Sequence, residues 1–257
     1  MLQLMTHLVA NFPDPESFKI ALKVMFNAQV KYLEIQLPFS NPVADGPINY
    51  EANIKALRHN SGLENVLNSI DEIFKPNRHA TSLVLMSYIT PLQYFGFEKL
   101  CQKLRESNFK YLIVPDLTFG TPEYIQLQAF SSKNDLSMIP VLPLNISQGR
   151  LDLIKSTLRL NQPIYIMARN GTTGKITELN QLQQQFIDLK SRLQNFDICI
   201  GFGIQNANQT KFLNVLNLTP VIGSAITKLI SESNQENLEQ NLGDFLAKMS
   251  VKSLSKI

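Results

Sequence analysis

The sequence predicts an α/β protein, specifically a (β/α)8 barrel of the TIM type with eight parallel strands. Short apolar or β-branched segments alternate with longer stretches of helical periodicity from one end of the chain to the other, and no linker interrupts them. The length of 257 residues is close to the roughly 250 residues of a single barrel of this kind. We therefore expect one domain spanning residues 1–257.

Eight segments are predicted to form the strands. They are Leu4 to Ala10, Tyr32 to Leu37, Ser82 to Tyr88, Tyr111 to Val114, Met138 to Leu142, Ile164 to Ala168, Asp197 to Gly201 and Val221 to Gly223. The stretches between them carry apolar side chains at helical spacing, for example Phe18, Leu22 and Met25, or Leu151, Ile154 and Leu158. Each of these helices has one apolar face, which must pack against a sheet. An open doubly wound sheet would more often carry a glycine-rich fingerprint after its first strand, which this chain lacks.

Two helix starts are marked by capping chemistry. Asp14 and Thr121 each precede a proline, so each pair offers a capping side chain followed by proline at the first helical position. We expect helices to begin at both places.

Composition and charge exclude several classes of function. The 24 Lys and Arg residues nearly balance the 21 Asp and Glu residues and are dispersed, so no nucleic-acid surface is predicted. Apolar runs of about five residues are too short to cross a membrane. The start of the chain lacks a basic signal region, which favours a cytoplasmic location. We expect Cys101 and Cys199 to be reduced and buried, and His7, His59 and His79 lack metal-ligand spacing.

The segment Tyr32 to Pro47 contains the first candidate for chemistry. In a strand, alternate side chains share a face, so Leu33 and Ile35 meet the helices while Glu34 points into the barrel. A carboxyl group there either has a raised pKa and an acid/base role, forms a buried ion pair, or reaches solvent through a different register. Asp45 lies in the following loop, where a turn-forming aspartate is the alternative to a catalytic one.

Three later loops contain glycines where a barrel binds ligands. Gly201 to Ile204 follows the seventh strand and Val221 to Ala225 follows the eighth, the two loops that commonly form a phosphate site. Tight turns are the alternative for these glycines. Met167 to Gly174 follows the sixth strand and is either a mobile lid or an ordinary surface loop.

Several side chains at strand ends could form a flat apolar slot for an aromatic ligand. Met86 and Tyr88 on the third strand, and Tyr165 and Met167 on the sixth, share the inner face if the alternation holds. Plain core packing is the alternative for all four. Asp116, which ends the fourth strand, has either a loop-capping or a catalytic role.

Together these motifs resemble the tryptophan synthase alpha chain family, whose members cleave indole-3-glycerol phosphate to indole and glyceraldehyde 3-phosphate. The resemblance covers nearly the whole chain, through LVANFPDP, LEIQLPFSNPVADGP, LMSYITP, IVPDL, ARNGTTG, GFGI and VIGSA. Its most specific block is PFSNPVADGP, residues 38–47.

The resemblance implies a role for each matching residue. Glu34 and Asp45 correspond to the family's catalytic glutamate and aspartate. The resemblance places Tyr88, Tyr165 and Phe202 near the indole, and assigns the phosphate to Gly174, Gly203, Gly223 and Ser224. It also implies that Arg169 and Thr173 belong to a closing loop, in which the threonine reaches the catalytic aspartate.

The resemblance further implies a partner. The family acts in an α2β2 complex whose beta chain carries pyridoxal phosphate and receives indole, while the alpha chain needs no metal or cofactor. Gln36 stands where the family usually has glycine, and Asn41 replaces the usual aspartate at a position associated with the partner interface. Two alternatives therefore stay open: a catalytically weak subunit that mainly activates its beta partner, and another barrel enzyme acting on a phosphorylated sugar.

Overall fold

The computed structural model describes residues 1–74, 80–168 and 176–250 of the chain. Within these residues, parallel strands form one curled sheet in the order β5-β4-β3-β2-β1-β9-β8-β7-β6. The strands are β1 (Leu2–Val9), β2 (Val30–Gln36), β3 (Ser82–Met86), β4 (Phe109–Ile113), β5 (Ser137–Met138), β6 (Val141–Pro143), β7 (Pro163–Met167), β8 (Asp197–Gly201) and β9 (Thr219–Ile222).

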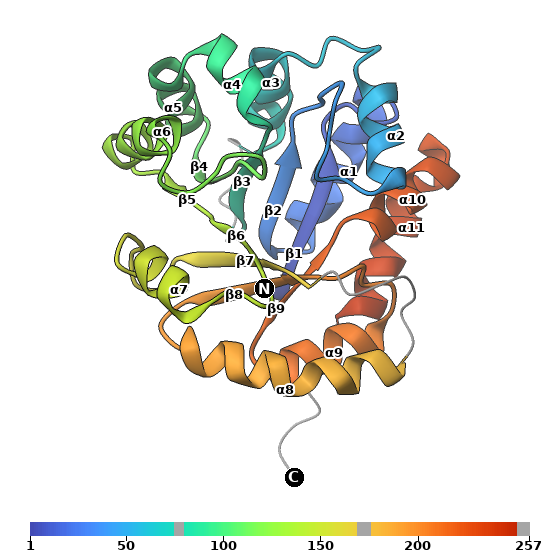
Figure 1. Cartoon of the computed structure of the whole chain (residues 1–257). Helices are drawn as coiled ribbons and strands as arrows, with labels where there is room; N and C mark the ends of the chain where they lie inside the picture. Colours follow the sequence, from blue (N-terminus) through green and yellow to red (C-terminus); the bar gives the residue numbers. More distant parts are fainter. Residues whose placement is uncertain (75–79, 169–175, 251–257) are drawn as a thin grey trace.

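Helices follow most of the strands and lie around the outside of the sheet (Figure 1). They are α1 (Pro15–Asn27), α2 (Pro47–Ala56), α3 (Leu63–Phe74), α4 (Ile89–Phe95), α5 (Phe97–Glu106), α6 (Pro122–Lys133), α7 (Gln148–Lys155), α8 (Ile176–Arg192), α9 (Ala207–Val215), α10 (Ser224–Glu232) and α11 (Gln235–Met249). This alternation of parallel strands and helices confirms the predicted α/β class.

The other predicted strands differ from the observed ones only in their end residues, but the strand predicted over Met138 to Leu142 is divided. It forms two short strands, β5 and β6, which stand at opposite ends of the sheet order although only Ile139 and Pro140 separate them. The Ile139 amide donates to the Leu112 carbonyl of β4 over 2.8 Å, and the Pro140 carbonyl accepts from the Tyr165 amide of β7 over 3.0 Å. The two edges of the curled sheet therefore belong to a single extended segment.

Both predicted helix starts are confirmed. The Asp14 side chain accepts from the Ser17 amide over 3.0 Å before Pro15 opens α1. The Thr121 hydroxyl accepts from the Tyr124 amide over 3.3 Å at the start of α6. Capping thus satisfies amides that have no partner within the helix.

The apolar spacing of Leu151, Ile154 and Leu158 predicts a helix that reaches Leu158, whereas the observed helix is shorter. Leu151 and Ile154 are fully buried on α7, but this helix ends at Lys155, before Leu158. The amide of Leu158 instead donates to the Lys155 carbonyl in a turn, from which the side chain still packs against the core.

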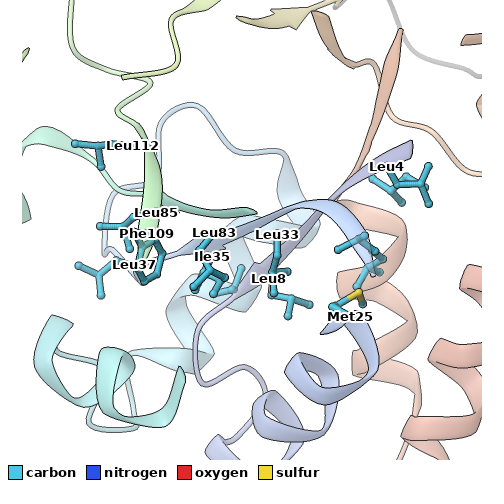
Figure 2. Packing of buried hydrophobic residues seen from close by; sticks show 14 of the residues in the cluster. Leu4, Leu8, Met25, Leu33, Ile35, Leu37, Leu83, Leu85, Phe109 and Leu112 are labelled. Atoms are coloured by element: carbon cyan, nitrogen blue, oxygen red, sulfur yellow. The ribbon is translucent and has the colours of Figure 1, made fainter. Parts of the chain in front are cut away.

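The core has two layers, one on each side of the sheet. Leucines and isoleucines of the strands meet the helices in the outer layer, and Figure 2 shows Leu8 and Leu33 near Met25 of α1. The inner layer combines tyrosine and sulfur-containing side chains with branched aliphatic ones, namely Met5, Tyr32, Val84, Met86, Tyr88, Ile113, Ile139, Cys199 and Val221. The alternation predicted for the second strand is confirmed, since Leu33 and Ile35 face outward whereas Tyr32 faces inward.

At the amino ends of the strands, Asp197 joins three strands through its side chain. Its Oδ2 accepts from the Tyr32 hydroxyl of β2 and pairs with the Lys31 ammonium, each at 2.5 Å. Its Oδ1 accepts from the Thr219 hydroxyl of β9 over 3.0 Å. Burial and the Asp197 charge raise the pKa of Tyr32, so this tyrosine stays a hydrogen-bond donor.

Removing Asp197 is expected to destabilise the fold without disturbing chemistry at the other end of the strands. The Asp197→Ala variant leaves the Tyr32 and Thr219 hydroxyls unpaired, at an expected loss of about 2 kcal/mol of unfolding free energy. Thermal unfolding should show a midpoint lower by roughly 5 °C. The Asp188→Ala variant removes a more exposed partner, that of Arg192, and should change the midpoint little. Equal midpoints for the two variants would contradict this role.

Two further expectations concern the chain as a whole. Cys101 and Cys199 are both buried and free of any disulfide, as predicted. In the part of the chain that the structure describes, none of the helices has the length and apolar character needed to span a bilayer.

Candidate active site

A cavity of about 330 Å³ opens at the carboxyl ends of the strands, and it brings together most of the predicted site residues. Those that line it are Glu34, Asp45, Tyr165, Phe202, Gly203, Gly223 and Ser224. Arg169, Thr173 and Gly174 lie outside the described residues. Tyr88 is described but does not line the cavity.

Glu34 projects from β2 into the interior of the curled sheet. Its side chain is 5% exposed, and it lies in register with His7 of β1 and Val84 of β3. Burial raises the pKa of the Glu34 carboxyl, the nearby Asp45 charge raises it further, and His7 opposes the shift. No described residue forms a hydrogen bond with this carboxyl group. Glu34 is therefore a buried acid with a raised pKa, and it points inward as the strand alternation predicted.

Asp45 lies on the loop between β2 and α2, and its side chain is held by two donors. The Gln36 amide nitrogen donates to Asp45 Oδ2 over 2.7 Å, and the Tyr88 hydroxyl donates to the same oxygen over 2.8 Å. Asp45 also takes part in a turn, because its backbone amide donates to the Pro42 carbonyl over 3.0 Å. The turn thus uses the backbone of Asp45, and the carboxylate remains available to the cavity.

Tyr88 is completely buried behind Asp45. Its ring stacks on Phe39 with centroids 5.3 Å apart, and its hydroxyl accepts from the Ala44 amide over 3.0 Å while it donates to Asp45. Burial and the charge of Asp45 raise the pKa of Tyr88, which keeps its proton in place. Tyr88 therefore fixes the loop that carries Asp45. Contact between Tyr88 and a ligand stays a prediction.

The walls of the cavity are largely apolar and aromatic. Met86, Ile113, Tyr165 and Phe202 contribute to them from four different strands or strand ends. A Cβ at Gly201 would overlap the Tyr165 hydroxyl, so glycine is needed there for the tyrosine to occupy this position. The result is a slot suited to a flat aromatic ligand beside the two carboxyl groups.

The loops after β8 and β9 border the cavity with glycine backbone. Gly203 has a φ of +79°, a conformation that side chains rarely adopt. Gly223 precedes Ser224, the first residue of α10, so the open amides of this helix start lie at the edge of the cavity. A helix start with free amides favours an anion.

Asp116 has the capping role that was one of its two alternatives. Its Oδ1 accepts from the Ile89 amide over 3.0 Å near the start of α4, and it does not line the cavity that contains Glu34. Burial raises the pKa of this carboxyl, and the bond from Ile89 opposes the shift.

Sequence reasoning missed His7 and Gln36 as members of the site. His7 lines the cavity beside Glu34, its register partner on the neighbouring strand, and Gln36 contacts Asp45 directly. The available signal was the alternation of β1, which puts His7 on the same face as Met5. Among the described residues, no group of three or more histidine, cysteine or acidic side chains is arranged to hold a metal ion.

The arrangement can bind a ligand that carries both an aromatic ring and an anionic group. A buried carboxyl group with a raised pKa and a second carboxyl group held by two hydrogen bonds line the same cavity as the glycine loops after β8 and β9. Such a pair of carboxyl groups in different environments suits proton transfer between atoms of a bound ligand.

Comparisons with known sequences point to one family. A family profile described as tryptophan synthase alpha chain matches residues 2–255. A tryptophan synthase alpha chain from Lactococcus lactis is 30% identical over 224 residues, which cover 87% of this chain and 85% of the relative. One from Leptospira borgpetersenii is 31% identical over 222 residues, which cover 86% of this chain and 83% of the relative.

Solved structures show the same fold. A protein from Aquifex aeolicus has a TM-score of 0.81 at 27% identity, over 96% of this chain and 93% of its own. A tryptophan synthase alpha chain from Legionella pneumophila has a TM-score of 0.82 at 23% identity, over 96% and 90%. The tryptophan synthase complex of Pyrococcus furiosus contains a chain with a TM-score of 0.79 at 22% identity, over 96% of both chains.

Proposed function

The chain belongs to the tryptophan synthase alpha chain family, and on that premise we propose that Glu34 and Asp45 catalyse its reaction. The reaction is the cleavage of indole-3-glycerol phosphate to indole and glyceraldehyde 3-phosphate, which makes this chain a carbon–carbon lyase. The observation that carries the assignment is the pairing of a buried acid with a hydrogen-bonded carboxylate in one cavity.

The substrate fits the cavity in one orientation. The indole ring occupies the aromatic slot, with Tyr165 and Phe202 beside it, and Tyr88 supports this end through Asp45. The phosphate lies against the loops of Gly203 and Gly223. Arg169, Thr173 and Gly174, which follow β7 in the sequence, complete our proposed site.

Glu34 moves the protons of the reaction. Its neutral carboxyl gives a proton to indole C3, which leaves a positive charge on the ring nitrogen. The Glu34 carboxylate then takes the proton of the glycerol hydroxyl, whose oxygen becomes the carbonyl oxygen as the carbon–carbon bond breaks. The bonding electrons return to the ring, and Glu34 ends the cycle protonated. A positioned acid and base of this kind contributes about 10² to 10⁴-fold in rate.

Asp45 holds the indole N–H during this transfer. Its Oδ2 is occupied by the donors of Gln36 and Tyr88, which leaves Oδ1 to accept from the ring nitrogen. The carboxylate charge stabilises the positive nitrogen that forms when C3 is protonated, so this contact strengthens in the transition state.

Phosphate binding supplies the energy that orients the reacting bond. The amides around Ser224 at the start of α10, together with Gly203, offer donors to the phosphate oxygens. Because the phosphate is distant from the bond that breaks, this binding energy serves positioning.

The chain acts as the alpha subunit of an α2β2 complex and passes indole to a beta chain. Solved tryptophan synthase complexes contain chains with this fold. In that assembly pyridoxal phosphate belongs to the beta partner. The proton transfers assigned to Glu34 balance without a cofactor in this chain.

We also infer that the curled sheet is a closed eight-stranded barrel, with β5 and β6 as two halves of one strand. Support comes from the amide of Ile139 and the carbonyl of Pro140, which bond to β4 and β7 on opposite sides of the segment. Residues from both halves of the chain, from His7 to Ser224, line one cavity. This supports a single domain over residues 1–257.

An indole-release assay with indole-3-glycerol phosphate tests the function, with and without added beta chain. We expect the alpha chain alone to release indole and the beta chain to increase the rate. Release that requires the beta chain would favour the weak, activating subunit. No release under either condition, together with no thermal protection by the substrate, would favour a different phosphosugar enzyme.

A further inference from the structure

Two buried side chains, His7 and Gln36, are hydrogen-bonded in series to the Asp45 carboxylate. His7 Nε2 lies 2.9 Å from the Gln36 side-chain oxygen, and the Gln36 side-chain nitrogen lies 2.7 Å from Asp45 Oδ2. Gln36 is completely buried and His7 is 5% exposed. The three residues come from β1, β2 and the loop that follows β2, so these hydrogen bonds tie the loop to the sheet.

The chemistry of the groups fixes the direction of each hydrogen bond. An ionised carboxylate only accepts hydrogen bonds, so the nitrogen of the Gln36 amide must face Asp45. The amide oxygen consequently faces His7, and His7 Nε2 must carry a proton that it donates. One orientation of Gln36 therefore satisfies both neighbours, and turning the amide over would break both bonds.

The other nitrogen of His7 lies against Gly223, directly after β9. His7 Nδ1 is buried, and no described residue forms a hydrogen bond with it. A Cβ at Gly223 would lie 3.3 Å from this nitrogen, so the imidazole ring packs against the backbone that follows β9. Gln36 is thus hydrogen-bonded on one side to His7, which packs against Gly223, and on the other side to the Asp45 carboxylate.

We propose that Gln36, braced by His7, is a positioning residue that holds the Asp45 carboxylate toward the indole nitrogen. The inference rests on the proposed function, because it acts through Asp45. Two donors on Oδ2, one from Gln36 and one from Tyr88, fix the plane of the carboxylate and leave Oδ1 for the substrate. Hydrogen bonds to a charged acceptor are roughly twice as strong as neutral ones, so losing one frees the carboxylate to rotate.

The first test replaces Gln36 with methionine, which has a similar shape but cannot donate. We expect kcat for indole release to fall about 10 to 100-fold, since misplacing a reacting group by 1 Å can reduce rates by about 10². The matched control is Thr6→Val on β1, a buried position whose hydroxyl has no hydrogen-bond partner among the described residues. This control should keep the kcat of the parent.

A double-mutant cycle separates positioning from general structural damage. If Gln36 acts through Asp45, adding Gln36→Met to the Asp45→Asn variant should reduce single-turnover indole release by less than about two-fold further. A purely structural role predicts that the full factor of the single variant appears again. Full additivity would overturn the inference.

The Gln36→Glu variant covers the case in which the methionine variant fails to fold. A neutral glutamic acid at this position can donate to Asp45 and accept from His7, whereas its ionised form repels Asp45. The titratable groups that face position 36 are His7, Asp45 and Glu34, with Tyr88 behind Asp45. Activity relative to the parent should therefore rise as the pH is lowered.

The outcomes distinguish this inference from the function on which it rests. An active parent with unchanged kcat in Gln36→Met, or a constant relative activity of Gln36→Glu across pH, would overturn the positioning role alone. A parent that releases no indole in the presence of the beta chain would overturn the proposed function and this inference with it.

Discussion

Replacing Glu34 with glutamine is expected to lower kcat for indole release by about 10² to 10⁴-fold, the contribution typical of a positioned acid and base. Glutamine keeps the shape of the side chain and fits the same position between His7 and Val84. It has no proton to give to indole C3 and cannot take one from the glycerol hydroxyl. Steady-state kinetics with the alpha–beta complex would measure the loss.

The same substitution should leave the fold intact or stabilise it. The folded-state pKa of Glu34 is raised, so the folded chain binds a proton that the unfolded chain has already released once the pH passes the ordinary value of 4.5. Stability therefore falls as pH rises from 4.5 through the raised pKa, and an uncharged amide removes that loss. Thermal unfolding at neutral pH should show an unchanged or higher midpoint for Glu34→Gln. A lower midpoint together with lost activity would point to structural damage instead.

The pH profile of the parent enzyme gives a second view of Glu34. The working form at the start of the cycle is the neutral acid, so kcat should decline as the pH rises past the raised pKa of this group. The alkaline limb should consequently lie above 4.5. A limb at the ordinary pKa of an exposed glutamate would contradict the assignment of Glu34 as the proton donor.

Strand order and alternation made most of the fold predictable from sequence. Alternation in Tyr32 to Leu37 assigned the outer face to Leu33 and Ile35, as found. The division into β5 and β6 was not predictable, because a continuous apolar run does not reveal that Ile139 bonds to β4 whereas Pro140 bonds to β7. The end of α7 before Leu158 escaped prediction for a related reason, since apolar spacing continues into a packed turn.

Site residues were predictable from sequence only where the pattern of a single strand marks them as unusual. Glu34 stood out because a carboxyl group on an inward face is unusual, whereas His7 and Gln36 acquire meaning from contacts between strands and a loop. The family resemblance could not assign Gln36, which stands where the family usually has glycine. The bond from the Tyr88 hydroxyl to Asp45 likewise depends on a contact between a strand end and a loop, and the expected contact of Tyr88 with the ligand stays a prediction.

Asp45→Asn is expected to reduce kcat by about 10² to 10³-fold, the range found when a group that stabilises a developing charge is removed. The control is Asp116→Asn, in which the amide oxygen can still accept from the Ile89 backbone and cap α4. This control should retain kcat within about three-fold, because charge alone is lost at an exposed cap.

The size of the effect at Asp45 follows from the donors that surround it. Gln36 and Tyr88 both donate to Oδ2, and the indole N–H donates to Oδ1 in the proposed complex. An asparagine offers one oxygen and one NH₂ group, so either the two protein donors or the indole N–H must face another donor. The variant therefore loses the negative charge and cannot satisfy all three donors in either orientation. Asp45→Asn activity equal to that of Asp116→Asn would show that Asp45 does not contact the ring nitrogen in the transition state.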